Sequence, residues 1–175
     1  MTETAEQQID RLTKIVPDFP KPGISFRDLT PVFADGAALR AITEALVEPF
    51  RGEVDAVAGV EARGFVLAAA AAYALGTGVL IIRKPGKLPR TTIAQSYDLE
   101  YGSATLEIQP DDLPVGSRIL LLDDVLATGG TLAAGVSLLD RAGWQVAGVS
   151  VVLELAELNG RAALPGYRVR ALSTR

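Results

Sequence analysis

The sequence of 175 residues contains neither cysteine nor histidine. Without cysteine, the chain has no disulfide, no thiolate nucleophile and no metal site with sulfur ligands. Without histidine, it lacks the commonest general base and the commonest metal ligand in proteins. Any catalysis must therefore depend on carboxylates, Lys, Arg, Tyr, backbone groups or a hard cation such as Mg²⁺, which prefers oxygen ligands.

An excess of positive charge is also absent. The chain has 17 Lys and Arg against 21 Asp and Glu, a net charge of −4. This balance argues against nucleic-acid binding through neutralised phosphates. Hydrophobic residues make up 49% of the chain and charged residues 22%, which is typical of a globular protein. The length predicts one domain with a sizeable core.

Signals for export or membrane insertion are weak. The first ten residues are acidic and polar, unlike a signal peptide. The uncharged stretch 64–82 is long enough to cross a bilayer, but Gly76-Thr77-Gly78 divides it into an alanine-rich part and a β-branched part. We therefore expect a buried helix, a turn and a buried strand, and a cytoplasmic protein that does not span a membrane.

Hydrophobic periodicity predicts helices that alternate with strands. We expect helices at 5–14, 37–50, 64–75 and 131–141, and strands at 54–59, 79–83, 105–108, 119–122, 146–153 and 167–172. This alternation indicates an α/β fold with a mostly parallel central sheet flanked by helices. Because ligands collect beyond the carboxyl ends of parallel strands, the loops after 59, 82 and 122 should face one common site.

The most informative segment is ILLLDDVLATGGT, at positions 119–131. Its apolar part predicts a strand buried on both faces. The glycine pair allows a tight turn that brings N–H groups close to an anion, and the predicted helix adds the positive end of its dipole. Thr128 and Thr131 add hydroxyl donors for a phosphate. Asp123 and Asp124 could accept hydrogen bonds from sugar hydroxyls, so the segment predicts a site for a ribose 5-phosphate.

A strand-to-helix turn with a threonine cap and surface carboxylates would explain a glycine pair alone. The whole segment is more specific than that, and we favour the functional interpretation. No Gly-Lys-Ser/Thr follows the glycines, and no Gly-x-Gly-x-x-Gly motif occurs in the chain. Sites for nucleoside triphosphates and dinucleotides therefore lose their main support.

A second anion-binding pattern follows the predicted strand at 54–59. Arg63 opens the alanine-rich helix, where N–H groups and a guanidinium could bind pyrophosphate together. Taken alone, Arg63 would more simply pair with Glu61 at the surface. The loop 83–90 contains four cations in eight residues. It could be an ordinary solvated loop, but in an acidic chain it also focuses the field on an anionic substrate.

Two further segments are candidates for function. The polar stretch 83–102 is long for a connection in a compact domain, which is typical of a disordered segment or a functional lid. Lid closure would desolvate Glu100 and raise its pKa towards that of a proton donor, although an exposed or paired glutamate also fits the sequence. Phe26 lies in a loop rich in Pro and Gly, where it could stack on a flat heterocycle or pack into the core.

Five segments together give the chain a family resemblance. They are FPKPGISFRD (19–28), EARGF (61–65), RKPGKLP (83–89), YDLEYG (97–102) and LDDVLATGGT (122–131). From about position 9 to position 161, the chain closely resembles the adenine phosphoribosyltransferases of the type I phosphoribosyltransferase superfamily. The last segment resembles the superfamily's motif for phosphoribosyl pyrophosphate (PRPP), and the middle three discriminate within the superfamily.

The resemblance implies a fold and a reaction. It implies the type I phosphoribosyltransferase fold as a single domain over 1–175, with a base-pocket segment at 1–50 and a flexible lid at 83–104. The implied reaction, in purine salvage, converts adenine and PRPP to AMP and pyrophosphate. Mg²⁺ would be bound mainly through PRPP, with no protein ligand assigned to it. The resemblance further implies a homodimer, and neither nucleic acid nor a membrane is an expected partner.

The resemblance also implies roles for individual residues. Glu100 would assist proton transfer at the purine, Tyr101 would lie in the lid, and a cis non-proline peptide is expected near Ala62–Arg63. Glu100 and Arg63 are the expected catalytic residues. The ribose and its 5′-phosphate would be bound by Asp123, Asp124, Ala127, Thr128, Gly129, Gly130 and Thr131. Pyrophosphate would be bound by Arg63, Lys84 and Lys87, and adenine by the ring of Phe26 and the backbone of Ser25 and Arg27.

Three other functions remain open at this stage. A transferase for another purine would keep the PRPP site and differ only in the base pocket. A regulatory PRPP-binding module would have lost catalysis, but such proteins usually carry a DNA-binding domain, and the first fifty residues lack a basic recognition helix. A receiver-like domain would explain the acid pair but not the Thr-Gly-Gly-Thr sequence or the basic loop.

Overall fold

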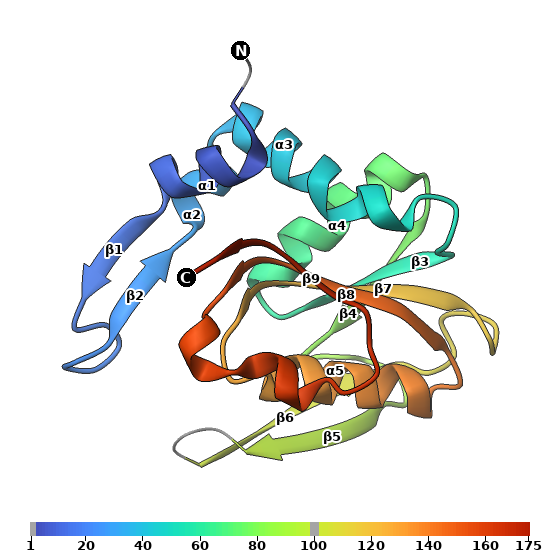
Figure 1. Ribbon diagram of the computed structural model, residues 1–175. Coiled ribbons are helices and arrows are strands. Elements are labelled where there is room, and N and C mark those ends of the chain that lie inside the picture. The colour runs from blue at the N-terminus through green and yellow to red at the C-terminus, as the bar shows by residue number, and fades with distance from the viewer. Residues whose placement is uncertain (1–2, 99–101) are drawn as a thin grey trace.

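The computed structural model describes residues 3–98 and 102–175 (Figure 1). Within these residues the largest sheet has five parallel strands in the order β4-β3-β7-β8-β9. The strands are β3 (Ala56–Val60), β4 (Gly78–Ile82), β7 (Arg118–Leu126), β8 (Gln145–Glu154) and β9 (Val169–Thr174).

Helices cover both faces of this sheet (Figure 1). One face packs on α1 (Ala5–Leu12), α3 (Gly36–Val47) and α4 (Arg63–Leu75), and the other on α5 (Gly130–Arg141). Side chains of β7 alternate between the two faces, as they must in a strand. Leu120 and Leu122 pack on the first side, and Ile119 and Leu121 on the second. The apolar run at 119–122 is therefore buried on both faces, as predicted.

Two antiparallel hairpins lie outside the central sheet. The first pairs β1 (Lys14–Pro17) with β2 (Ser25–Asp28) and extends away from the sheet at the left of Figure 1. Its connecting loop contains a cis Phe19–Pro20 peptide. The second pairs β5 (Ile93–Asp98) with β6 (Ser103–Ile108) beside α5. We predicted loops at 19–28 and over most of 83–102 and no strand before position 54, so β1, β2 and β5 were missed. Strand β6 lies where a strand was expected, at 105–108.

The bounds of several elements also differ from the predictions. The first helix ends at Leu12, because the chain then enters β1. The helix expected at 37–50 ends at Val47, and a 3₁₀ turn, η1 (Glu48–Phe50), follows it. Strand β7 runs to Leu126, four residues beyond the predicted end. Three short helices complete the fold: α2 (Thr30–Ala34), η2 (Ala156–Leu158) and η3 (Gly160–Ala163).

The predicted fold class, an α/β fold with a parallel central sheet between helices, is confirmed. Among the helices that the structure describes, none has the length and apolar character needed to cross a bilayer.

Candidate active site

A cavity of about 450 Å³ opens at the carboxyl ends of β3 and β7. Parallel sheets place ligand sites at this edge, because the loops after neighbouring strands converge there. Segments far apart in the sequence line the cavity: 24–27 from the first hairpin, 60–63 after β3, 123–132 around the end of β7, and parts of 153–158. Lys84 and Tyr97 also contribute to its lining.

The acid pair lies inside strand β7, not in the turn that follows it. Asp124 is 4% exposed, and its N–H donates to Asp123 Oδ1 at 2.9 Å. Burial raises the pKa of the Asp123 carboxyl well above its usual range, and the neighbouring Asp124 charge raises it further. Burial also raises the pKa of Asp124, while the charge of Arg63 opposes that rise. A bound cation or additional hydrogen-bond donors would therefore stabilise the charged form of the buried acid pair.

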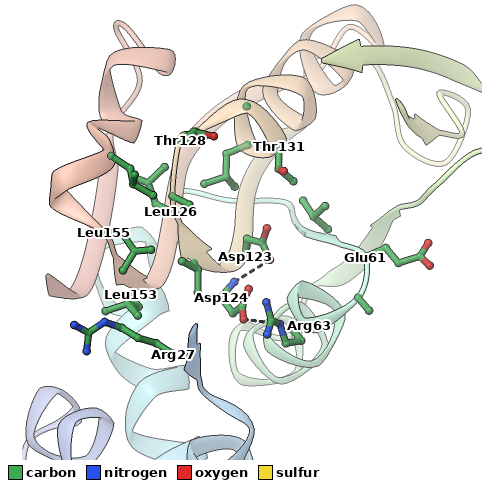
Figure 2. Close-up of a pocket in the computed structure, with 18 of the residues that line it drawn as sticks. Arg27, Glu61, Arg63, Asp123, Asp124, Leu126, Thr128, Thr131, Leu153 and Leu155 are labelled. Atoms are coloured by element: carbon green, nitrogen blue, oxygen red, sulfur yellow. Dashed lines mark hydrogen bonds and ion pairs between the residues drawn. The ribbon is translucent and has the colours of Figure 1, made fainter. Parts of the chain in front are cut away.

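Arg63 joins two walls of the cavity. Its Nε lies 2.7 Å from Asp124 Oδ2 (Figure 2), and its guanidinium carbon lies 5.4 Å from the centre of the Phe26 ring. The alternative of a surface pair between Arg63 and Glu61 is not what the structure contains. A cis peptide joins Glu61 to Ala62, next to the Ala62–Arg63 position where one was expected.

Glu61 instead orients the basic loop that follows β4. Its Oε2 accepts hydrogen bonds from Arg83 Nε at 3.2 Å and from the Lys84 N–H at 3.1 Å. These bonds, that of Lys84 first, lower the pKa of Glu61. Among the described residues Arg63 and Lys84 line the cavity and Lys87 does not, so two of the three predicted pyrophosphate ligands are brought together.

The predicted phosphate-binding residues form one loop at the cavity edge. Gly129 precedes α5 with φ of 88°, a backbone angle that favours glycine. Helix α5 (Gly130–Arg141) begins at the next residue, and the N–H groups of its first turn have no partner within the helix. Its first residues belong to the segment 127–131 that lines the cavity. Thr131 Oγ1 donates to the Tyr97 hydroxyl oxygen at 3.3 Å. We did not predict Tyr97 as a site residue, although its strand has a clear alternation of half-buried and exposed residues.

The first hairpin forms the opposite wall. Ser25, Phe26 and Arg27 all line the cavity. Phe19 packs edge-on against Phe26, with ring centres 5.1 Å apart. The Arg27 side chain points away from the acid pair in Figure 2, so its backbone is the part nearer to the site. Glu100 and Tyr101 lie outside the described residues, and their roles stay predictions.

Comparison with known proteins agrees with this geometry. The family model of the phosphoribosyl transferase domain matches residues 32–165. The adenine phosphoribosyltransferase of Renibacterium salmoninarum is 68% identical over 170 residues, which cover 97% of this chain and 93% of that protein. The chain belongs to the adenine phosphoribosyltransferase family.

Solved structures of adenine phosphoribosyltransferases share the fold. That from Thermoanaerobacter pseudethanolicus has a TM-score of 0.93 at 42% identity, over 98% of this chain and 100% of that one. The enzyme from Giardia lamblia, solved with 9-deazaadenine, has a TM-score of 0.92 at 34% identity and 99% coverage of both chains. The predicted membership of the adenine phosphoribosyltransferase family is thus confirmed.

Proposed function

We propose that this cavity is the active site of an adenine phosphoribosyltransferase, which converts adenine and PRPP to AMP and pyrophosphate. The contacts of Arg63 carry the proposal. One guanidinium touches both Phe26, on the predicted base segment, and Asp124, on the predicted ribose segment. The reaction needs the base, the sugar and the leaving group at one point, and the three segments assigned to them meet there.

The loop 127–131 would bind the 5′-phosphate, and the acid pair would bind the ribose hydroxyls. The loop offers N–H groups at the start of α5 and the hydroxyls of Thr128 and Thr131. Two sugar hydroxyls would donate to Asp123 and Asp124, which compensates the carboxylates for their burial. Hydrogen bonds donated by the substrate would then lower the raised pKa of the pair.

Pyrophosphate would leave towards Arg63 and Lys84, with Lys87 joining only if its loop moves. Negative charge grows on the leaving group in the transition state, so fixed cations there lower the barrier. Within the described residues, no group of three or more acidic side chains is placed to hold a metal ion. The acid pair has the oxygen ligands that suit Mg²⁺, but too few for a cage, which fits Mg²⁺ that arrives with PRPP. Bound to PRPP in this cavity, Mg²⁺ would neutralise part of the negative charge of the pyrophosphate.

Adenine would stack on Phe26, with the backbone of Ser25 and Arg27 reading its edge. Glu100 would assist proton transfer at the purine, and Tyr101 would help to cover the site. The segment 83–104 would act as a lid. Its β5 strand is attached to α5, since Arg141 Nη1 donates to Ala94 O at 2.7 Å, and its Tyr97 lines the cavity. Closure around this attachment would exclude water from PRPP.

We further propose one catalytic domain over 1–175, with 1–50 contributing the base pocket, and a homodimer in the cytoplasm. The exposed face of α4 and the edge strand β4 support the dimer. Val66 is 46% exposed, Tyr73 93%, Val79 42% and Ile81 39%. Exposed apolar side chains on two adjacent elements favour a protein interface, and sedimentation would give the oligomeric state.

The test is pyrophosphate release from PRPP and Mg²⁺, with adenine, hypoxanthine, guanine or xanthine supplied separately. Release with adenine alone, giving AMP, is expected. Release with another base would refute the base assignment, and PRPP binding without release would favour the regulatory module. Glu100→Ala should lower turnover far more than PRPP affinity, and unchanged turnover would remove Glu100 from the chemistry.

A further inference from the structure

We infer that Gly160 and Arg161 are positioning residues for the phosphate loop. They lie in the segment 155–163, which we call the backing segment and which received no role from the sequence motifs. The inference rests on the proposed function, because the loop 127–131 is assigned there to the 5′-phosphate. Neither residue is needed to touch the substrate.

The backing segment and the phosphate loop pack backbone against backbone. A Cβ atom on Gly129 would overlap the Gly160 carbonyl oxygen and come within 2.8 Å of the Ala163 Cβ. A Cβ atom on Gly160 would in turn overlap the Ala127 carbonyl oxygen and come within 2.7 Å of a Leu126 methyl carbon. Real Cβ contacts are not this short, so the two segments approach this closely only because both positions are glycine.

Positions 129 and 160 require glycine for different reasons. Gly129 has φ of 88°, so its backbone angle already favours glycine. Gly160 is buried and is not among the residues with positive φ. An alanine at 160 therefore has an acceptable backbone but no room. The requirement at 160 comes from the neighbouring loop, which makes that position a probe of the contact itself.

Arg161 anchors the backing segment to β8 and β9, and β8 is the neighbour of the strand that carries the acid pair. Its Nε and Nη2 donate to the two carboxylate oxygens of Glu154, each at 2.8 Å, and its Nη1 donates to Val169 O at 2.9 Å. The Glu154 side chain is 9% exposed and ends β8, directly beside Leu126 at the end of β7. The Leu155 N–H donates to Leu126 O at 2.9 Å. A two-pronged, partly buried pair of this kind fixes geometry as well as adding stability.

The backing segment therefore sets how far the phosphate loop can recede from the cavity. The loop would bind through N–H groups whose directions must suit one phosphate, and a displacement of about 1 Å can cost on the order of a hundredfold in catalysis. A displacement of Ala127 away from Gly160 would mainly weaken the binding of PRPP and AMP. Adenine would be little affected, because its proposed contacts come from the first hairpin.

The decisive variant is Gly160→Ala, with Gly36→Ala as its control. A Cβ atom at Gly36 has nothing within 4 Å, and that glycine also has no positive φ. In Gly160→Ala we expect the KM for PRPP to rise about tenfold or more, while the KM for adenine changes less than about twofold. Gly36→Ala should match the parent protein in both. A folded Gly160→Ala variant with unchanged PRPP kinetics would overturn the inference.

Arg161→Met is the second variant, and it decides the question if Gly160→Ala does not fold. It should raise the KM for PRPP with little change in that for adenine, and Arg161→Lys should restore part of the loss. A merely structural role would lower the melting temperature and leave both KM values in place. Ribose 5-phosphate binding, measured by calorimetry without adenine, separates this inference from the proposed reaction. If the parent protein binds it but does not turn over adenine, the reaction fails and the comparison of variants still stands.

Discussion

Replacing Arg63 by Met tests the contact on which the functional proposal depends. Methionine keeps an apolar side chain beside Phe26 but removes the ion pair with Asp124, whose atoms are 2.7 Å apart. Exposed ion pairs are worth about 0.2–1 kcal/mol, and breaking a buried pair costs about 3–5 kcal/mol. The Arg63 side chain is 38% exposed and that of Asp124 only 5%. We therefore expect an intermediate loss, about 1–3 kcal/mol of unfolding free energy.

A double-mutant cycle with Asp124→Asn isolates the pair. The unfolding free energy in urea should show a coupling of about 1–2 kcal/mol, after discount for the exposed arginine. The Arg118–Asp55 pair, with side chains 45% exposed on both sides, is the matched control and should couple by less than about 1 kcal/mol.

The pH dependence gives a second check. The charge of Arg63 is the largest influence that opposes the rise in the Asp124 pKa caused by burial, so its removal raises that pKa further above the value in the unfolded chain. The stability of the variant should then fall as the pH rises, and the loss relative to the parent should be greater at pH 8 than at pH 5. A coupling below about 0.3 kcal/mol, or an equal loss at both pH values, would refute the reasoning.

Three further predictions test two other parts of the site and the packing of β3 against α4. Phe26→Ala should raise the KM for adenine by about tenfold with little change for PRPP, since base stacking is worth about 1–3 kcal/mol, and an unchanged KM for adenine would contradict the stacking. Asp123→Asn should weaken PRPP binding yet raise the melting temperature at pH 7.5, because it removes a buried acid whose raised pKa makes the fold less stable above the unfolded-state value. That gain should vanish on acidification, and a melting temperature below that of the parent protein at pH 7.5 would contradict the destabilising role of Asp123. Gly59→Ala should lower the melting temperature by about 2–12 °C, since its Cβ would lie 2.5 Å from Gly64 O and overpacking costs about 1–3 kcal/mol; melting equal to that of the parent protein would show that the contact is relaxed in solution.

The central sheet was largely predictable because its strands are buried. Residues such as Leu120 and Leu121 pack on opposite faces, so the whole run is apolar and stands out in the sequence. The end of β7 was not predictable in the same way. Its ladder with β8 continues past the acid pair to Leu126, and carboxylates inside a strand interrupt the apolar signal.

The strands β1, β2 and β5 of the two hairpins were missed because they do not bury a regular hydrophobic face. All four residues of β1 are exposed, and β2 has no alternation of buried and exposed positions. Strand β5 does alternate, but its half-buried positions include Gln95 as well as Ile93 and Tyr97, so the hydrophobic pattern is weak.

Around the cavity, the sequence indicated the segments that come together but not the partner of each charge. Glu61 and Asp124 are both acids within reach of Arg63 in principle, and only the packing of α4 against β7 brings Asp124 to it. Lys84 and Lys87 lie in one basic loop with the same charge. Their different positions depend on the hydrogen bond from the Lys84 N–H to Glu61, a contact between residues 23 positions apart that no local pattern encodes.

The first hairpin, β1 and β2, has a consequence for how this kind of enzyme can diversify. It carries Phe26 to the cavity, yet within the part of the chain that the structure describes it forms a sheet of its own and shares no ladder with β7, which bears the acid pair (Figure 1). If the proposed adenine contacts hold, we therefore expect substitutions within 14–28 to alter the nucleobase preference without shifting the register of the central sheet. On the proposed assignments, base binding and sugar-phosphate binding depend on separate modules, which we expect to tolerate change independently on one scaffold.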